Sequence, residues 1–239
     1  MNDSSRDAAP TADTVPATNA PVAVLCSAGL DSAVLLAHLA QTATVVPVYV
    51  RVGLAWEAAE RATLAALLAA PVFTGRAEAL VVLDLDMRDV YPPTHWALAG
   101  RAPAYDTPDE DVYIVGRNIV LLTKAAIACC YRRVSRLAIG PLAGNPFPDA
   151  TPEFFAAISR ALSLGLAHPI AVEAPFSTWS KEAVIRRGAA LGVPFEHTLS
   201  CMSPVSRDGG WRACGACSKC RERHDAFAAA GVPDPAQMR

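Results

Sequence analysis

Short apolar runs alternate with longer segments of helical composition along most of the chain. Five runs read as buried strands, because parallel strands are nearly continuous stretches of apolar residues; they lie at residues 22–25, 45–50, 80–85, 136–140 and 170–173. Segments rich in Ala and Leu predict helices at residues 33–40, 56–70, 118–131, 151–167 and 180–191. This alternation predicts an α/β fold, in which a doubly wound, mostly parallel five-stranded sheet carries helices on both faces.

Capping and turn residues agree with these boundaries. Thr151 and Ser180 stand where a side chain caps a helix, Pro152 suits a first helical position, and Gly192 predicts a helix end. Pro47 predicts an irregular start or a bulge in the second strand. The polar, proline-rich segment 86–112 is long for a connection and indicates a lid, a binding loop or a dimer contact.

The junction of the first strand and the first helix carries candidate chemistry. Small residues there let backbone N–H groups approach an anion, and the helix N-terminus adds positive potential. Residues 27–32 read Ser-Ala-Gly-Leu-Asp-Ser. This sequence is similar to S-G-G-x-D-S, the pyrophosphate loop of enzymes that cleave ATP to AMP and pyrophosphate, with Ala28 in place of the first Gly. We expect the nucleotide to be bound by the loop and the following turns: Cys26, Ser27, Ala28, Gly29, Leu30, Asp31, Ser32, Ala33, Val34, Leu35 and Leu36.

Four cysteines near the C-terminus have metal-ligand spacing. Cys201, Cys214, Cys217 and Cys220 follow C-x12-C-x2-C-x2-C, and the Gly, Ser, Lys and Arg between them favour a knuckle over a buried helix. Four thiolates complete the tetrahedral shell of a structural Zn²⁺ and leave no open catalytic position. A disulfide cluster is the alternative, but residues 1–20 lack the apolar run of a secretory signal, so we expect a reduced, cytoplasmic protein.

Composition divides the chain into three predicted parts and limits the classes of binding partner that we expect. Residues 1–20 read as a disordered tail, 21–195 as an adenine-nucleotide-binding α/β domain, and 196–239 as a small zinc-binding helical appendage. The net charge is −2 over 239 residues and no basic run stands out, so no nucleic-acid partner is expected. No apolar stretch is long enough to span a membrane.

Taken together, the ordered motifs resemble the 7-cyano-7-deazaguanine synthase family over residues 22–235. Besides the loop at 26–32, VGRN at 115–118 is similar to the family's P-G-R-N, and SKEAVI at 180–185 is similar to its T-K-x-E-I-I. PEF at 152–154 and ALSLG at 161–165 also match, as does the cysteine region from residue 200 through Asp234-Pro235. An ordered set of this kind is more specific than any single motif.

The resemblance implies a reaction and the residues that serve it. These enzymes convert 7-carboxy-7-deazaguanine to a nitrile, with ATP and ammonia, through an acyl adenylate and an amide. By this resemblance Ser27, Gly29, Asp31 and Ser32 would hold pyrophosphate, with Asp31 a candidate Mg²⁺ ligand, and Arg117 and Lys181 would face phosphate or acyl-phosphate oxygens. The implied partners are small molecules, with a homodimer as an option. Arg117 pairing with a carboxylate and Lys181 at the surface are the ordinary alternatives.

The chain departs from the family where the acceptor would be recognised. Residues 49–57 replace the family's Y-G-Q-R-H-like string, and residues 145–151 replace a longer loop. Three alternatives therefore stay open: another carboxylate, protein or nucleoside acceptor, a sulfurtransferase with the same loop, and a non-catalytic nucleotide-binding regulator. For a deazaguanine acceptor we expect stacking on Phe147 or Trp96 and hydrogen bonds to acidic residues, although some of these acids can form a solvated face: Asp149, Glu153, Asp106, Asp109 and Asp111.

Overall fold

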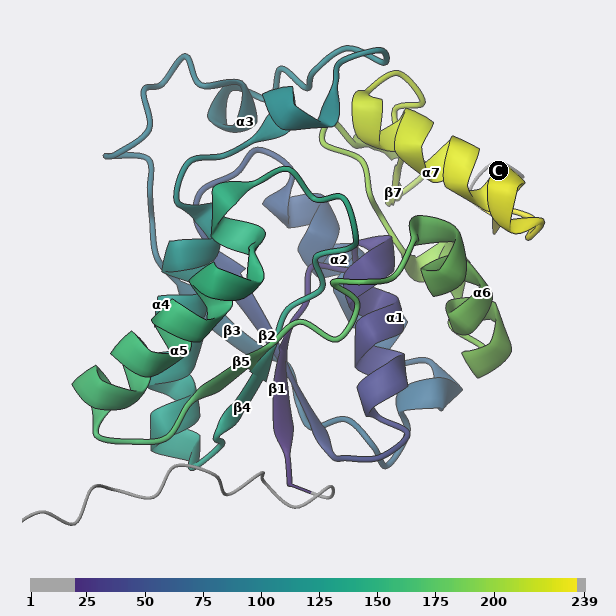
Figure 1. Cartoon of the computed structure of the whole chain (residues 1–239). Helices are drawn as coiled ribbons and strands as arrows, with labels where there is room; N and C mark the ends of the chain where they lie inside the picture. The colour runs from purple at the N-terminus through teal and green to yellow at the C-terminus, as the bar shows by residue number, and fades with distance from the viewer. Residues whose placement is uncertain (1–19, 236–239) are drawn as a thin grey trace, which may run out of the picture.

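The computed structural model describes residues 20–235, so nearly all of the predicted tail lies outside the described residues. Its centre is a parallel sheet in the order β3-β2-β1-β4-β5, which confirms the predicted five-stranded architecture (Figure 1). The strands are β1 (Val22–Leu25), β2 (Val45–Arg51), β3 (Val81–Asp84), β4 (Arg136–Ala138) and β5 (Ala171–Glu173). Chain order reverses between β1 and β4, and in open α/β sheets ligands bind at such a switch point.

Helices cover both faces of this sheet. Figure 1 shows α4 and α5 on one side and α1 and α6 on the other. The first face carries α4 (Arg117–Arg132) and α5 (Pro152–Leu166), and the second carries α1 (Leu30–Leu39), α2 (Glu57–Leu68) and α6 (Lys181–Leu191). A short helix α3 (Trp96–Ala99) lies in the long loop above the carboxyl ends of the strands.

The predicted helix caps are present. Thr151 Oγ1 accepts a bond of 3.1 Å from the backbone N–H of Phe154, and Ser180 Oγ accepts one of 3.3 Å from that of Ala183. Gly192 ends α6 in the left-handed region at φ 72°, where a residue without Cβ is favoured. One boundary differs: α1 begins at Leu30 rather than at residue 33, because extended Gly29 is already its N-cap. Asp31 and Ser32 therefore belong to the first turn of α1.

Pro47 lies inside β2 without ending the strand. It pairs in register with Val24 of β1. On the other side, β2 makes an isolated bridge from Val45 to Ala77, and the regular ladder with β3 starts only at Val48 and Val81. The missing N–H of Pro47 falls in this gap, so the irregularity that the sequence predicts costs no ladder hydrogen bond.

The C-terminal region packs on the sheet domain rather than standing apart. It contains a hairpin, β6 (Val205–Arg207) with β7 (Gly210–Arg212), and helix α7 (Ser218–Ala230). The hairpin lies between the first and second cysteines and was not predicted. Phe227 on α7 is buried in the same apolar core as α1 and α6. The division of the chain at residue 196 stays a prediction about its organisation.

None of the helices within residues 20–235 combines the length and the apolar character that crossing a membrane requires.

Gly188 sets the close approach of α6 to α1. A Cβ at this position would lie 2.6 Å from Val34 Cγ2 and 2.7 Å from Phe195 Cζ, closer than real contacts allow. Both neighbours are buried, so neither can move into solvent. The glycine therefore allows the helix that carries Lys181 to pack against the helix that carries Asp31.

We predict that Gly188→Ala lowers the free energy of unfolding by about 1–3 kcal/mol, the usual cost of overpacking a core. The matched control is Gly165→Ala on α5, where a Cβ would meet nothing within 4 Å. Since Ala is the better helix former, the control should gain about 0.5–1 kcal/mol. Urea denaturation followed by circular dichroism measures both, and equal behaviour of the two variants would contradict the packing argument.

Candidate functional site

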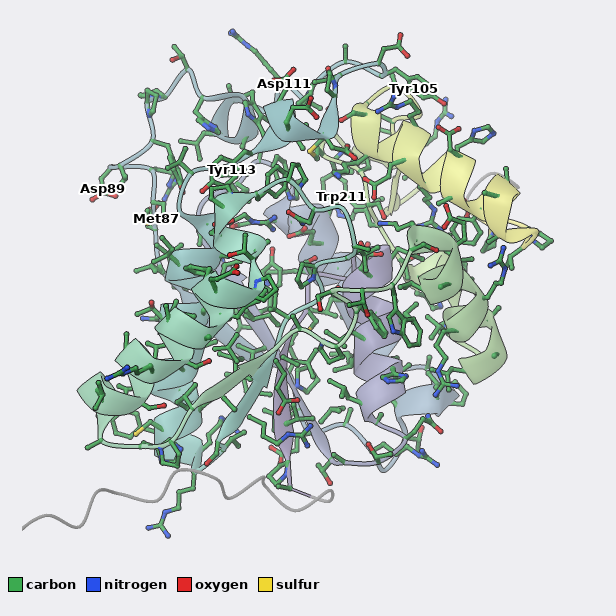
Figure 2. The ribbon with its side chains drawn as sticks, in the orientation of Figure 1. Met87, Asp89, Tyr105, Asp111, Tyr113 and Trp211 are labelled. Carbon is green, nitrogen blue, oxygen red and sulfur yellow. The ribbon has the colours of Figure 1, made fainter. Side chains whose placement is uncertain are left out.

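Two adjoining cavities open at the carboxyl ends of the strands. One, of about 260 Å³, lies over the ends of β1 and β2, and the other, of about 230 Å³, extends toward α7 and the long loop. Figure 2 shows Tyr113, which lines the second cavity, in the layer of loops above the sheet. The residues that line both cavities mark their common boundary: Ser27, Gly29, Asp31, Glu60, Arg117, Asn118 and Phe147.

The loop between β1 and α1, together with the first turn of α1, contributes three of these boundary residues. Ser32 Oγ donates to the carbonyl of Gly29 at 2.9 Å and accepts from the N–H of Ser27 at 3.3 Å, which closes the loop on itself. Ala28 has a φ of 59°, in the left-handed region. Its side chain is fully buried and lines neither cavity, so the methyl group does not occupy anion space.

The later residues of the segment predicted to bind the nucleotide lie in the core and do not face a cavity. Ala33, Val34, Leu35 and Leu36 are fully buried within α1 and belong to the core beneath the sheet. None of them lines either cavity. They support the loop from below, while the surface offered to a ligand comes from Cys26, Ser27, Gly29, Leu30, Asp31 and Ser32.

An ion-pair chain joins the loop to the C-terminal region. Lys181 Nζ lies 2.7 Å from Asp31 Oδ2 and 2.8 Å from Glu222 Oε1. Glu222 in turn pairs with Lys219 at 2.5 Å, and Lys219 lies 3.6 Å from Asp109 of the long loop. Burial alone would lower the pKa of Lys181, but the two carboxylates outweigh it and raise this pKa above its usual range. Lys181 is therefore a partly buried ammonium at the cavity wall, with its side chain 16% exposed, and not a free surface lysine.

Two polar atoms at the boundary are buried without a hydrogen-bond partner among the described residues. They are Asp31 Oδ1 and Arg117 Nε. An unpaired buried polar atom costs free energy unless a ligand satisfies it. Arg117 also has no ion pair within 4 Å among residues 20–235, so the simple pairing alternative for it is not observed. A carboxylate oxygen suits a divalent cation, and a guanidinium N–H suits a phosphate.

Arg117 is positioned by the cap of its own helix. The backbone N–H of Asn118 donates to Asp149 Oδ2 at 3.0 Å, and the Asn118 side chain donates to the carbonyl of Asp149 at 2.9 Å. Burial raises the pKa of Asp149, and its bonds from Asn118 act in the opposite direction. Asp149 lines the 230 Å³ cavity, but its carboxylate is already used to fix the start of α4.

Aromatic pairs line the 230 Å³ cavity. Trp56 and Trp96 stack with centroids 5.7 Å apart, and Tyr113 and Phe147 stack with centroids 5.2 Å apart. All four side chains face the cavity. Such surfaces bind flat, apolar-faced ligands. The expected stacking residues Trp96 and Phe147 are thus present at the cavity wall.

The other predicted acidic contacts lie outside the cavities. Glu153 is exposed on α5, and Asp106 and Asp111 are exposed on the long loop. Asp109 is also exposed and pairs with Lys219. For the three aspartates the structure agrees with the solvated-face alternative.

A buried glutamate at the boundary was not predicted from the sequence. Glu60 of α2 is 7% exposed, and its Oε2 accepts a bond of 2.7 Å from the hydroxyl of Tyr49 on β2. Burial is the main cause that raises the pKa of Glu60 to about 7. One turn earlier, Glu57 Oε1 accepts from the N–H groups of Val52 and Gly53 at 2.6 and 2.9 Å. Two glutamates one turn apart, directly after a strand, are the sequence signal that could have located this site.

The four predicted cysteine ligands converge, and their Sγ atoms all lie within 4.8 Å of one another. Three of their separations are 3.5, 3.9 and 3.9 Å, near the edge of about 3.8 Å that a Zn²⁺ tetrahedron with 2.3 Å bonds requires. Backbone N–H groups of Ser203 and Cys214 point to Cys201 Sγ at 3.3 Å, a geometry that stabilises thiolates. All four are free thiols, so the disulfide alternative is not observed. The donor set therefore fits a structural zinc.

The knuckle leads directly into α7. Cys217 is the N-cap of this helix, and Cys220 lies in its first turn. The expectation of a knuckle rather than a helix therefore holds for Cys201 and Cys214 but not for Cys220. Further along α7, buried Arg223 binds Asp234 through two bonds of 2.8 Å and also reaches the hydroxyl of Thr198 at 2.7 Å. These contacts fix α7 against the segment that follows α6.

Comparisons with known proteins show which family this chain is similar to. A family model described as "Queuosine biosynthesis protein QueC" matches residues 21–231. The 7-cyano-7-deazaguanine synthase of Methanoculleus marisnigri is 40% identical over 127 residues, which are 52% of this chain and 55% of that protein. The enzyme of the same name from Caldicellulosiruptor bescii is 36% identical over 132 residues, 54% of this chain and 58% of that protein.

A solved structure titled as a 4-thiouridine synthetase–RNA complex with bound ATP has 13% identity and a TM-score of 0.44, over 89% of this chain and 51% of that one. A similarity this low carries no functional conclusion. The aligned segments span little more than half the length of the curated relatives. The family model, in contrast, covers most of this chain, from the first strand through the last helix, and the chain therefore belongs to the QueC family.

Proposed function

We propose that this protein is an ATP-dependent ligase that converts a 7-deazaguanine carboxylate and ammonia to the corresponding nitrile, through an acyl adenylate and an amide. The observation that carries the proposal is the pair of cavities that meet at the β1–α1 loop, where Asp31 Oδ1 and Arg117 Nε have no hydrogen-bond partner within residues 20–235. Adenylation joins an acceptor oxygen to the α-phosphorus of ATP, so it needs two neighbouring ligand sites with a common boundary. The name shared by the relatives supports the same reaction.

The 260 Å³ cavity suits the nucleotide. Its wall mixes polar and apolar side chains, and the apolar part comes from the ends of β1 and β2, the segment after β2 and α4: Leu25, Val48, Val50, Leu54 and Leu121. An adenine ring would lie against this wall, with its phosphates toward residues 27–32. Ser27, Gly29 and Ser32 would supply hydroxyl and N–H donors from a helix N-terminus. Asp31 Oδ1 would hold Mg²⁺, which screens phosphate charge when bound.

The 230 Å³ cavity suits the acceptor. A deazaguanine ring has two flat faces and an edge of donors and acceptors, and the cavity offers Trp56, Trp96, Tyr113 and Phe147 as stacking surfaces. The acceptor carboxylate would then lie near Arg117 and Lys181. Both cations can stabilise the negative charge that develops as AMP and pyrophosphate leave. Lys181 needs only to exchange part of its contact with Asp31 for a phosphate oxygen.

The cysteine cluster would hold Zn²⁺ as a structural metal. With four thiolate ligands its shell is closed, and the ion would stabilise the fold without contacting substrates. The sulfurtransferase alternative requires a reactive thiol near the nucleotide. Among the cysteines of residues 20–235, Cys26 lines the nucleotide cavity. Burial raises the pKa of its thiol to about 12, which leaves Cys26 a poor nucleophile.

We expect the purified protein to release AMP and pyrophosphate from ATP when 7-carboxy-7-deazaguanine and ammonia are present. Asp31→Asn removes the charge that would hold the metal, so product formation should fall by at least two orders of magnitude. The control is Asp89→Asn, an exposed residue that Figure 2 shows at the outer edge of the long loop. Chromatography of nucleotide products measures both. ADP with phosphate, or no acceptor dependence, would contradict the proposal.

Replacing Cys217 by Ser should remove one zinc per chain and much of the stability, because binding energy at such a site is folding energy. Metal analysis by mass spectrometry and thermal unfolding provide the measurements. Cys130→Ser is the matched control, because Cys130 lies on α4 outside the cluster. The Cys130→Ser protein should therefore keep its zinc. A zinc content that is zero in the wild-type protein, or unchanged in Cys217→Ser, would show that the cluster is not the metal site.

A further inference from the structure

We propose that Glu60 is the base that removes protons from nitrogen during formation of the amide and the nitrile. This inference rests on the proposed function and assigns a step that the phosphate-binding residues do not perform. Nitrogen enters the reaction as ammonia with three hydrogens and leaves in the nitrile with none. Three N–H protons must therefore be transferred to some acceptor near the reacting carbon.

The position of Glu60 follows from the two cavities. The acceptor oxygen and the α-phosphorus must meet at their boundary, and the ammonia nitrogen attacks the carbon next to that oxygen. Asp31 and Glu60 are the carboxylates that line both cavities. Asp31 is paired with Lys181 at 2.7 Å, whereas Glu60 has no cation within 4 Å among the described residues. Glu60 is thus the boundary carboxylate that is not neutralised by an ion pair.

The surroundings of Glu60 tune it for proton exchange. Its Oε2 accepts a hydrogen bond from the hydroxyl of Tyr49 at 2.7 Å, and the neighbouring Trp56 side chain lowers its pKa. Burial raises the pKa of Glu60 to about 7, Glu57 raises it further, and Arg117 and Tyr49 lower it. Burial and Glu60 keep the pKa of Tyr49 above its usual range, so Tyr49 remains a donor. Glu60 also acts on Cys26, whose raised pKa keeps that neighbouring thiol neutral.

The steps balance with Glu60 as proton acceptor. Ammonia forms the C–N bond at the acyl carbon, the C–O bond to AMP breaks with its electron pair leaving on AMP, and one N–H proton passes to Glu60. The amide oxygen then attacks the α-phosphorus of a second ATP, pyrophosphate leaves, and a second N–H proton is lost. Loss of the third proton and of AMP gives the nitrile. After each transfer Glu60 returns its proton to water.

The sharpest test uses the amide as substrate, because ammonia and its own titration are then absent. With wild-type protein the rate of nitrile formation should rise as pH increases through about 7, where the folded-state pKa of Glu60 lies and the carboxylate becomes the free base. In Glu60→Gln the rate should fall on the order of 100-fold, as expected for loss of a general base, and the rise should disappear. Glu60→Asp should restore part of the rate and the rise.

Two further variants separate proton transfer from a structural role. Tyr49→Phe removes a bond that lowers the pKa of Glu60, so the rise should move to higher pH. Glu196→Gln, an exposed residue outside both cavities, should match the wild-type protein. Thermal unfolding of each variant checks that it is folded.

Pyrophosphate exchange with the carboxylate substrate distinguishes this assignment from the proposed function. Exchange needs no proton from nitrogen, so Glu60→Gln should keep it within about threefold. Exchange retained together with an unchanged amide-to-nitrile rate would overturn the role of Glu60 alone. A raised KM for the amide at unchanged kcat would make Glu60 a binding contact and would also overturn it. No exchange in the wild-type protein would overturn the proposed function, and the assignment with it.

Discussion

The partly buried ammonium of Lys181 holds three parts of the molecule together. It lies between Asp31 at the start of α1 and Glu222 on α7, with distances of 2.7 and 2.8 Å. Moving a charge partly out of water has a free-energy cost, which nearby carboxylates offset. The first turn of α1, the start of α6 and the first turns of α7 must therefore stay in register. Gly188 makes the same register possible, since it lets α6 approach α1 closely.

This constraint gives the cysteine cluster a consequence beyond local stability. Cys217 and Cys220 lie at the start of α7, and Lys219 and Glu222 lie on the same turns of the helix. Whatever fixes the cysteines also fixes the carboxylate that faces Lys181. The buried Arg223–Asp234 pair secures the next turn of α7. A structural metal bound by the cysteines would thus help to fix the position of the Lys181 ammonium at the cavity wall, although the metal itself contacts no substrate.

Local signals in the sequence were sufficient for much of the fold and for part of the site. Apolar runs located the five strands, and Thr151, Ser180 and Gly192 marked helix ends because capping depends on adjacent residues. The cysteine cluster followed from spacing alone. The partners of Lys181 did not, since Asp31 and Glu222 lie far from it in the sequence. Glu57 and Glu60 form a local signal after β2, but the burial of Glu60 and its contact with Tyr49 depend on how α2 lies against β2.

The departures from the family pattern act on different sides of the proposed site. At Ala28 the substitution leaves the loop intact, because the methyl group is buried in the core and the carbonyl is held by the N–H of Leu199 at 2.8 Å. Its cost is a left-handed backbone, of about 1–2 kcal/mol. Residues 49–57, in contrast, supply Tyr49, Trp56 and Glu57, and these surround Glu60 and the cavity boundary. The phosphate loop thus keeps its geometry, and the divergence falls on the walls beside it: Tyr49, Val50, Val52, Leu54 and Glu57 line the 260 Å³ cavity, and Trp56 lines the 230 Å³ cavity.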